Sequence, residues 1–198
     1  VYDLFSEAVW GKTPMGRPIL GTAETLDSIT PERMMKYIKE HYTSKSMVIA
    51  AVGKISDTFF DELEKYFGQR EIMNNEVVFE PATYTPRNVC ENRDFEQVQL
   101  VAGFKGIDMY DERVYSLLVF NNIFGSGMSS RLFQNIREKY GLVYSIGAGH
   151  SAYLDTGTFD IIAATTPENL DTVAELIQTE IKRIKTEPMT DDEIERGK

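Results

Sequence analysis

The sequence predicts an α+β fold: two layers, in which helices lie on one side of a mainly antiparallel sheet. Apolar residues in the helix-like segments recur every three or four positions, so each helix has a single apolar face. Short β-like runs alternate with these helices along the chain. Two of those runs, 143–149 and 157–164, flank the turn-forming sequence Asp155-Thr-Gly157, which is typical of an antiparallel strand pair.

The composition is that of an ordinary globular protein. Of 198 residues, 42% are hydrophobic and 26% are charged, so the chain can bury a core as one large domain or two small ones. A net charge of −10 argues against nucleic-acid and anionic-membrane partners. The single cysteine, Cys90, excludes an internal disulfide and favours a reducing compartment, so we expect a bacterial-type cytoplasmic protein. No apolar run approaches the roughly 20 residues of a membrane span.

The first third of the chain contains three helical segments and one β-like run. Residues 1–10 have apolar side chains on one helical face, and 11–29 form a loop rich in Gly and Pro. Thr30 caps the next helix. The continuous apolar run 47–52 predicts a buried strand, and 56–68 predict a helix that begins at a serine and ends at a glycine.

Polar residues and two prolines then separate this part from a second domain. We expect residues 1–70 to close a first domain, 71–94 to form an interdomain linker, and 95–198 to open the second domain. The first helix lacks a preceding capping residue and the last helix lacks a stop signal, so we interpret the chain as a fragment of a longer protein.

In the second domain the sequence predicts, in order, a strand, a helix, a turn, a helix, two strands and two helices. A strand is expected at 97–104 and a helix at 114–124. After the strand pair, an apolar stripe over 170–184 predicts the longest helix, which ends before Pro188. Thr190-Asp-Asp-Glu193 is a capping box, and its acidic residues suit the first turn of a helix better than an acid–base pair.

Residues 125–145 are the most informative stretch. Gly125 and Gly127 allow backbone angles or close contacts that other residues do not, and Ser129 or Ser130 can cap the helix that follows. The apolar stripe of this helix consists of Leu132, Phe133, Ile136 and Tyr140, and Gly141 ends it. Arg137 lies late in the helix and Tyr144 early in the next strand, so a tight turn can aim both at one spot.

The order Ser-Arg-Leu-Phe, Arg-Glu, Gly-Leu, Tyr-Ser in this stretch resembles the signature of the second domain of M16 zinc metallopeptidases (pitrilysin, insulysin, mitochondrial processing peptidase). The segment 13–22 is similar to the Gly-Arg-Pro-Ile-Leu-Gly segment of that family. The resemblance implies the two-layer M16 fold. It also implies that Arg137 and Tyr144 are catalytic residues contacting the substrate backbone. Further substrate-binding residues would be Gly125, Ser126, Gly127 and Ser129.

A zinc hydrolase needs three protein ligands, and this chain has only two histidines, His41 and His150. Neither His-Glu-x-x-His nor the inverted His-x-x-Glu-His occurs. The segment ending in Glu40-His41 has Tyr37 where the first ligand would stand, so we interpret it as the end of a helix. The resemblance therefore implies zinc in the parent protein, with its ligands upstream of Val1, and no metal or peptidase activity in this chain alone.

Three functional hypotheses remain open. The first is a fragment of a zinc metalloendopeptidase whose partners are a peptide or protein substrate and the other half of the peptidase. That half would belong to the same chain or to a partner subunit, and a homodimer is one such arrangement. The second is a non-catalytic M16-like subunit for peptide binding or assembly. The third is an unrelated α+β binding domain. Nucleophilic catalysis finds no support, because Cys90 has no patterned histidine partner.

Overall fold

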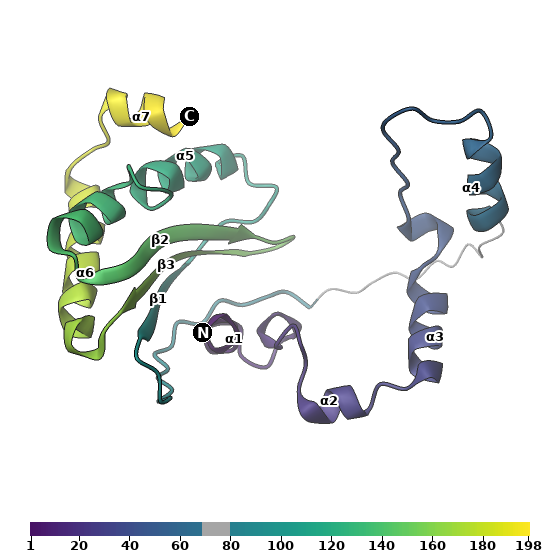
Figure 1. Ribbon diagram of the computed structural model, residues 1–198, viewed down its shortest axis with the longest axis horizontal. Helices are drawn as coiled ribbons and strands as arrows, with labels where there is room; N and C mark the ends of the chain where they lie inside the picture. Colours follow the sequence, from purple (N-terminus) through teal and green to yellow (C-terminus); the bar gives the residue numbers. More distant parts are fainter. Residues whose placement is uncertain (69–79) are drawn as a thin grey trace. The chain divides into compact units, whose positions relative to one another are not determined.

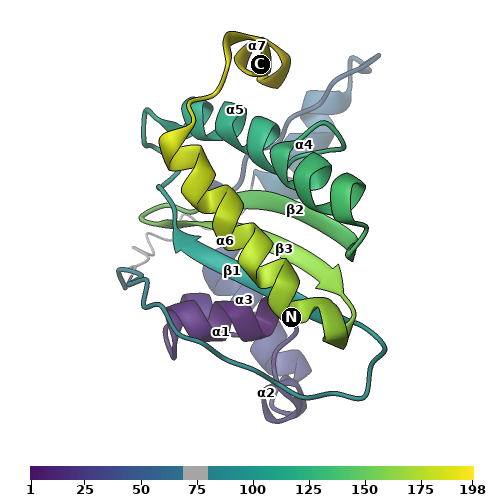
Figure 2. The same cartoon turned by 90° about the vertical axis from the view of Figure 1, so that its left-hand side faces the viewer.

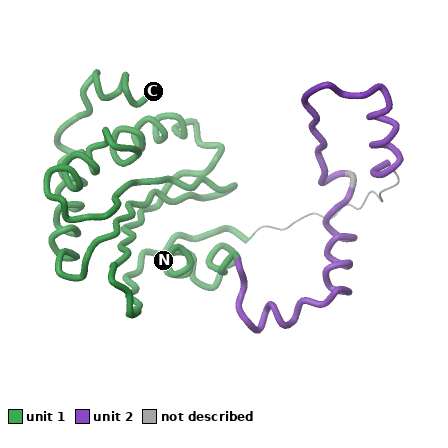
Figure 3. Tube along the Cα trace, viewed as in Figure 1, with its two compact units in different colours: residues 1–19, 80–198 green, residues 20–79 purple. Residues whose placement is uncertain are grey.

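The computed structural model describes residues 1–68 and 80–198, which belong to two compact units (Figure 3). The larger unit contains residues 1–19 and 80–198, and the smaller contains 20–79. The predicted linker lies partly outside the described residues. Elements of the larger unit are α1 (Tyr2–Trp10), η1 (Pro14–Gly16), β1 (Val98–Lys105), α5 (Val114–Phe124), η3 (Phe133–Glu138), β2 (Val143–Ala152), β3 (Gly157–Thr165), η4 (Pro167–Asn169), α6 (Leu170–Thr186) and α7 (Asp191–Gly197).

The larger unit is built on a three-stranded sheet with the order β1-β3-β2. Both neighbours pair antiparallel with β3, so Ile161 at its centre lies between Ala102 of β1 and Ala148 of β2. A bulge between Val143 and Ser145 interrupts the β2 ladder where the strand begins. The antiparallel sheet with helices confirms the predicted α+β class.

The hydrophobic core lies on one face of this sheet, under α5, η3 and α6. Figure 2 shows α6 crossing in front of the strands. Alternate residues of β3 point into this core, as expected for a pleated strand with one buried face. The buried core residues are Phe124, Leu132, Ile136, Val143, Ile146, Phe159, Ile161, Ala163, Val173 and Ile177. This layer holds the 125–145 stretch firmly against the sheet.

The other face of the sheet carries α1, which Figure 1 shows on the opposite side from α5. A Cβ atom at Gly103 would lie 2.2 Å from the Phe5 ring, so the aromatic ring occupies the space that a side chain would take. Trp10, which is 3% exposed, packs edge-on against Tyr84 and Tyr153, with ring centroids 5.7 and 6.4 Å apart. The first helix is therefore part of the larger unit.

The described part of the predicted linker also joins this unit. The amide of Thr85 donates to the Val9 carbonyl at 2.9 Å, and the Tyr84 hydroxyl donates to the Gly103 carbonyl at 2.9 Å. The amide of Ala82 donates to the Asp155 carboxylate at 2.9 Å. These contacts group residues 1–19 with 80–198, whereas the assignment of 1–70 and 95–198 to two M16 domains stays a prediction.

The smaller unit consists of helices α2 (Ala23–Asp27), α3 (Pro31–His41), η2 (Ser44–Ser46) and α4 (Phe59–Phe67). As predicted, Thr30 caps α3, accepting a hydrogen bond from the Arg33 amide. The strand predicted at 47–52 is wrong for this chain: these residues form no strand, and Val48 and Val52 are 96% and 102% exposed. A strand needs a neighbour for its backbone groups, and no other strand lies in the described part of this unit.

Candidate substrate-contact site

The glycines of the 125–127 turn have two different physical roles. Gly125 packs against β2: its carbonyl accepts a hydrogen bond from the Ala148 amide at 3.0 Å, and an added Cβ would lie 2.3 Å from the Ala148 Cβ. Its φ is −145°, so close approach and not backbone angle requires glycine there. Gly127 has φ +84° with open space around it, so it serves the left-handed conformation. The fold itself therefore explains why glycine stands at both positions, and a role of either glycine in substrate binding stays a prediction.

The serines of the turn also have different roles: one is buried and two are exposed. Ser130 is the helix cap: it is 1% exposed, its hydroxyl donates to the Gly127 carbonyl at 2.8 Å, and it accepts from the Phe133 amide at 3.4 Å. Ser126 and Ser129 are exposed. Their side chains are therefore available to a ligand, whereas that of Ser130 is used to hold the turn.

The helix after the turn is π-helical over Phe133–Glu138. Its side chains fall into three successive pairs spaced four residues apart, and each pair faces a different environment. Leu132 and Ile136 are 0% exposed in the core. The preceding pair, Arg131 and Asn135, bonds to later helices. The following pair consists of Phe133 and Arg137. Sequence periodicity predicted an ordinary helix, because the hydrogen-bond register of a π-helix leaves no residue pattern of its own.

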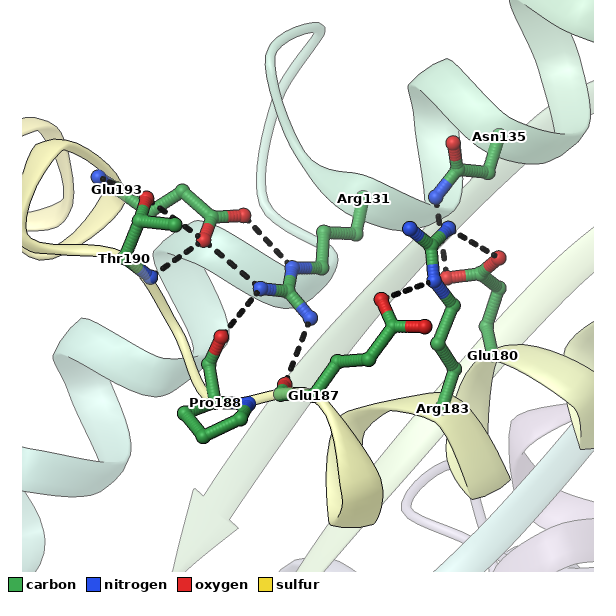
Figure 4. Close-up of polar contacts among 8 residues, drawn as sticks. All are labelled: Arg131, Asn135, Glu180, Arg183, Glu187, Pro188, Thr190 and Glu193. Carbon is green, nitrogen blue, oxygen red and sulfur yellow. Dashed lines mark hydrogen bonds and ion pairs between the residues drawn. The ribbon is translucent and has the colours of Figure 1, made fainter.

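Arg131 has a structural partner that the sequence did not reveal (Figure 4). Its Nε and Nη2 donate to the two carboxylate oxygens of Glu193, at 2.7 and 2.8 Å. Nearby, the Asn135 amide donates to Glu180 at 3.1 Å, and Arg183 pairs with Glu180 and with Glu187. These contacts tie the π-helical segment to α6 and to the start of α7.

The Arg131–Glu193 pair changes the ionisation of both groups. Hydrogen bonds from Arg131 lower the pKa of Glu193 to about 2, and the same bonds raise the pKa of Arg131. An open polar hollow of about 450 Å³ lies beside this pair and is also lined by Arg183 and Arg196. Arg131 and Arg183 are already neutralised by carboxylates of their own.

Arg137 is placed differently from Arg131. Its Cζ lies 4.9 Å from the centroid of the Phe133 ring, and it forms no ion pair or side-chain hydrogen bond within residues 1–68 and 80–198. Its side chain is exposed. The guanidinium is thus held by an aromatic face while its N–H groups are free to donate.

A short turn leads from Arg137 to Tyr144. The Gly141 amide donates to the Arg137 carbonyl at 2.9 Å, and Gly141 has φ +65°, the left-handed helix end that the sequence predicts. Tyr144 follows at the start of β2, beside the bulge, and is 54% exposed. The structure shows no contact between the Arg137 and Tyr144 side chains, which come from the end of the helix and from the start of the strand.

The two histidines lie in different units, and each has a neighbour of its own. His41 lies in the smaller unit with its ring 4.3 Å from that of Tyr37, and His150 lies on β2 opposite Phe159 in the larger unit. Among the described residues, no group of three or more His, Cys, Asp or Glu side chains is arranged to hold a metal ion. The described residues therefore offer no ligand set that fits zinc, and the expected upstream ligands stay a prediction. Likewise, no described helix has the length and apolarity to cross a membrane.

Comparisons with known proteins agree with the resemblance seen in the sequence. Residues 28–198 match the family described as the peptidase M16 inactive domain. The chain is 38% identical over 198 residues to the uncharacterized zinc protease YmxG of Bacillus subtilis, and 36% identical over 200 residues to an uncharacterized zinc protease of Rickettsia felis. Both matches cover 100% of this chain and 48% of the relative, so the chain spans about half the length of these proteins.

Solved structures share the fold. The crystal structure of a peptidase M16 inactive domain from Pseudomonas fluorescens has a TM-score of 0.86 at 22% identity, covering 99% of this chain and 48% of that chain. A protease from Helicobacter pylori has a TM-score of 0.82 at 17% identity, covering 99% and 49%. The family match covers most of the chain, and the fold agrees with it. The chain belongs to the M16 peptidase family.

Proposed function

We propose that this chain is part of a zinc-dependent M16 metalloendopeptidase that hydrolyses peptides or small proteins. In this proposal the chain supplies the surface that faces the zinc-bearing domain and contacts the substrate backbone. Arg137 and Tyr144 are the catalytic residues of that surface, and the turn from Gly125 to Ser129 borders it. The relatives are named uncharacterized zinc proteases, and these names support the peptidase assignment.

The observation that carries the proposal is the setting of the Arg137 guanidinium, which lies over the Phe133 ring and forms no ion pair or side-chain hydrogen bond with residues 1–68 and 80–198. Arg33, Arg93, Arg113, Arg131 and Arg183 form side-chain hydrogen bonds or ion pairs with residues of this chain, whereas Arg17, Arg87 and Arg196, like Arg137, form none among the described residues. Arg137 instead rests on an aromatic ring, within a helix anchored by the fully buried Leu132 and Ile136. A fixed helix that presents an unneutralised guanidinium is suited to binding an acceptor on another molecule.

The chemistry follows from the donors. A guanidinium offers a rigid fork of N–H groups, and the phenol of Tyr144 offers an O–H group. Directed at the carbonyl of a peptide bond, both bind more strongly as negative charge develops on the oxygen, which lowers the barrier to attack. Neither group needs to change its charge to do this. Zinc bound in the longer protein would supply an activated water.

The test compares this chain with the longer parent protein for zinc content and for hydrolysis of a quenched-fluorescent peptide library. We expect a zinc-loaded, active parent and a chain that is inert alone. Stoichiometric zinc and chelator-sensitive hydrolysis by this chain alone would contradict the proposal. An inert, zinc-free parent would also contradict it, in favour of a non-catalytic subunit for peptide binding or assembly.

A further inference from the structure

The π-helical segment contains one aromatic contact that the proposed reaction does not yet use. The Phe133 ring lies under the guanidinium of Arg137, with 4.9 Å between Cζ and the ring centroid. We propose that Phe133 is a positioning residue that holds Arg137 in the orientation in which its N–H groups reach a substrate carbonyl. This inference rests on the proposed function, because it concerns how the same site is made ready.

The position of the pair follows from its neighbours. Phe133 comes directly after Leu132, and Arg137 comes directly after Ile136; both of these preceding residues are 0% exposed. Two residues that each follow a buried anchor, four positions apart, lie on the same side of the helix. The π-helical register, which is common at functional sites, maintains this alignment over Phe133–Glu138. The backbone thus places ring and guanidinium together without a further contact.

An aromatic ring differs from a carboxylate as a support for arginine. Glu193 fixes Arg131 by occupying its N–H groups and neutralising its charge. The Arg137 Cζ lies over the Phe133 ring, and an aromatic ring, unlike a carboxylate, neither takes up the N–H groups in strong hydrogen bonds nor neutralises the positive charge. Only this second arrangement both restricts the rotamers of a long side chain and keeps it able to bind an oxyanion.

The alternative role for Phe133 is to cover apolar surface only. The ring is half-buried, so a covering role alone would be served equally by leucine. The two roles are separated by substitutions that keep the apolar bulk but remove the ring, and by substitutions that keep the ring. Tyr115, which is 76% exposed on α5, provides a matched aromatic control outside the site.

The experiment measures kcat and KM of the longer, zinc-loaded protein on a quenched-fluorescent peptide. We expect Phe133→Leu to lower kcat about threefold to tenfold, with a smaller change in KM, since the contact acts through charge stabilised in the transition state. Phe133→Tyr should stay within about twofold of the original, because the ring face remains. Tyr115→Leu should leave kcat unchanged, and zinc content should be equal in all variants.

A double-mutant cycle assigns the effect to Arg137. In an Arg137→Ala background, Phe133→Leu should have no further effect on kcat. Equal loss of activity in both backgrounds, or equal activity of Phe133→Leu and Phe133→Tyr, would overturn the positioning role. If Arg137→Ala itself leaves kcat unchanged, the proposed function fails instead, so the two failures are distinguishable. Thermal unfolding of each variant identifies any loss of folding, and if Phe133→Leu does not fold, Phe133→Met, which also keeps apolar bulk without a ring, is compared with Phe133→Tyr instead.

Discussion

The guanidinium of Arg131 and the carboxylate of Glu193, 62 residues apart in sequence, form a bidentate ion pair, with Nε–Oε1 at 2.7 Å and Nη2–Oε2 at 2.8 Å. Their side chains are 14% and 19% exposed. Glu193 also accepts a hydrogen bond from the Thr190 amide in the capping box of α7. One carboxylate therefore joins the start of α7 to the helix that carries Arg137.

Substitution of Arg131 should weaken the fold. Arg131→Lys keeps the charge but cannot make both hydrogen bonds, so we expect the free energy of unfolding to fall by about 1–3 kcal/mol. Arg113, which pairs with Asp111 and is 75% exposed, is the matched control; Arg113→Lys should lower the free energy of unfolding less than Arg131→Lys does, because solvent screens an exposed pair. Urea unfolding measures both. Equal, small effects would mean that the Arg131 pair contributes little.

Acid should remove the contribution of Glu193 over a defined range. Its pKa in the folded protein is about 2, below the ordinary 4.5. The fold binds fewer protons at this group than the unfolded chain does, so its stabilisation is complete above pH 4.5 and is lost as the pH falls from 4.5 towards 2.

The measurement is the difference in unfolding free energy between the original and Glu193→Gln, followed from pH 6 to pH 2. Asp111, with a pKa also of about 2, titrates in the same range in both proteins and cancels. The difference should shrink as the pH falls. A difference that is constant with pH would contradict the lowered pKa.

The two glycines of the turn should respond differently to substitution. Gly125→Asn places a side chain against Ala148, where a Cβ would be only 2.3 Å away, so we expect a loss of at least about 2 kcal/mol. Gly127→Asn meets open space at φ +84°, and asparagine tolerates left-handed angles, so the cost should stay below about 1 kcal/mol. Thermal unfolding of both variants decides; a larger loss at Gly127 would refute this assignment.

Residues 47–52 should become ordered by pairing in the longer protein. They are apolar and favour a strand, yet Val48 and Val52 are fully exposed in this chain. We expect their amides to exchange with deuterium at least about tenfold more slowly in the longer protein than in this chain, because ladder hydrogen bonds protect them. The amides of Pro31–His41 serve as the internal reference. Equal exchange of 47–52 in both proteins would count against a missing strand partner.

Local chemistry accounts for what the sequence could predict. Thr30 and Thr190 cap helices as expected. Gly141 adopts the left-handed backbone conformation expected at the end of the helix that contains the π-helical segment. The strands expected at 97–104 and 143–149 appear as β1 and β2 with small shifts at their ends. These features depend on residues within a few positions of one another, which sequence patterns record directly.

Features that depend on distant residues were not predictable. Nothing near Arg131 indicates Glu193, and nothing near Trp10 indicates Tyr84 and Tyr153. The strand at 47–52 was wrong because strand propensity requires a neighbour as well as a residue pattern. The candidate site was identified by the resemblance to the M16 family, whereas the aromatic support of Arg137 became visible only in the structure.

The most direct test of the account is the turnover number of the longer protein after Arg137→Ala and after Tyr144→Phe, with zinc content measured on the same samples. Loss of a donor to a developing oxyanion should lower kcat by about 10²-fold or more while zinc content stays unchanged. Arg113→Ala, at an arginine outside the site, is the matched control and should retain full activity. Unchanged turnover in both site variants, or loss of zinc along with activity, would contradict substrate contact by Arg137 and Tyr144.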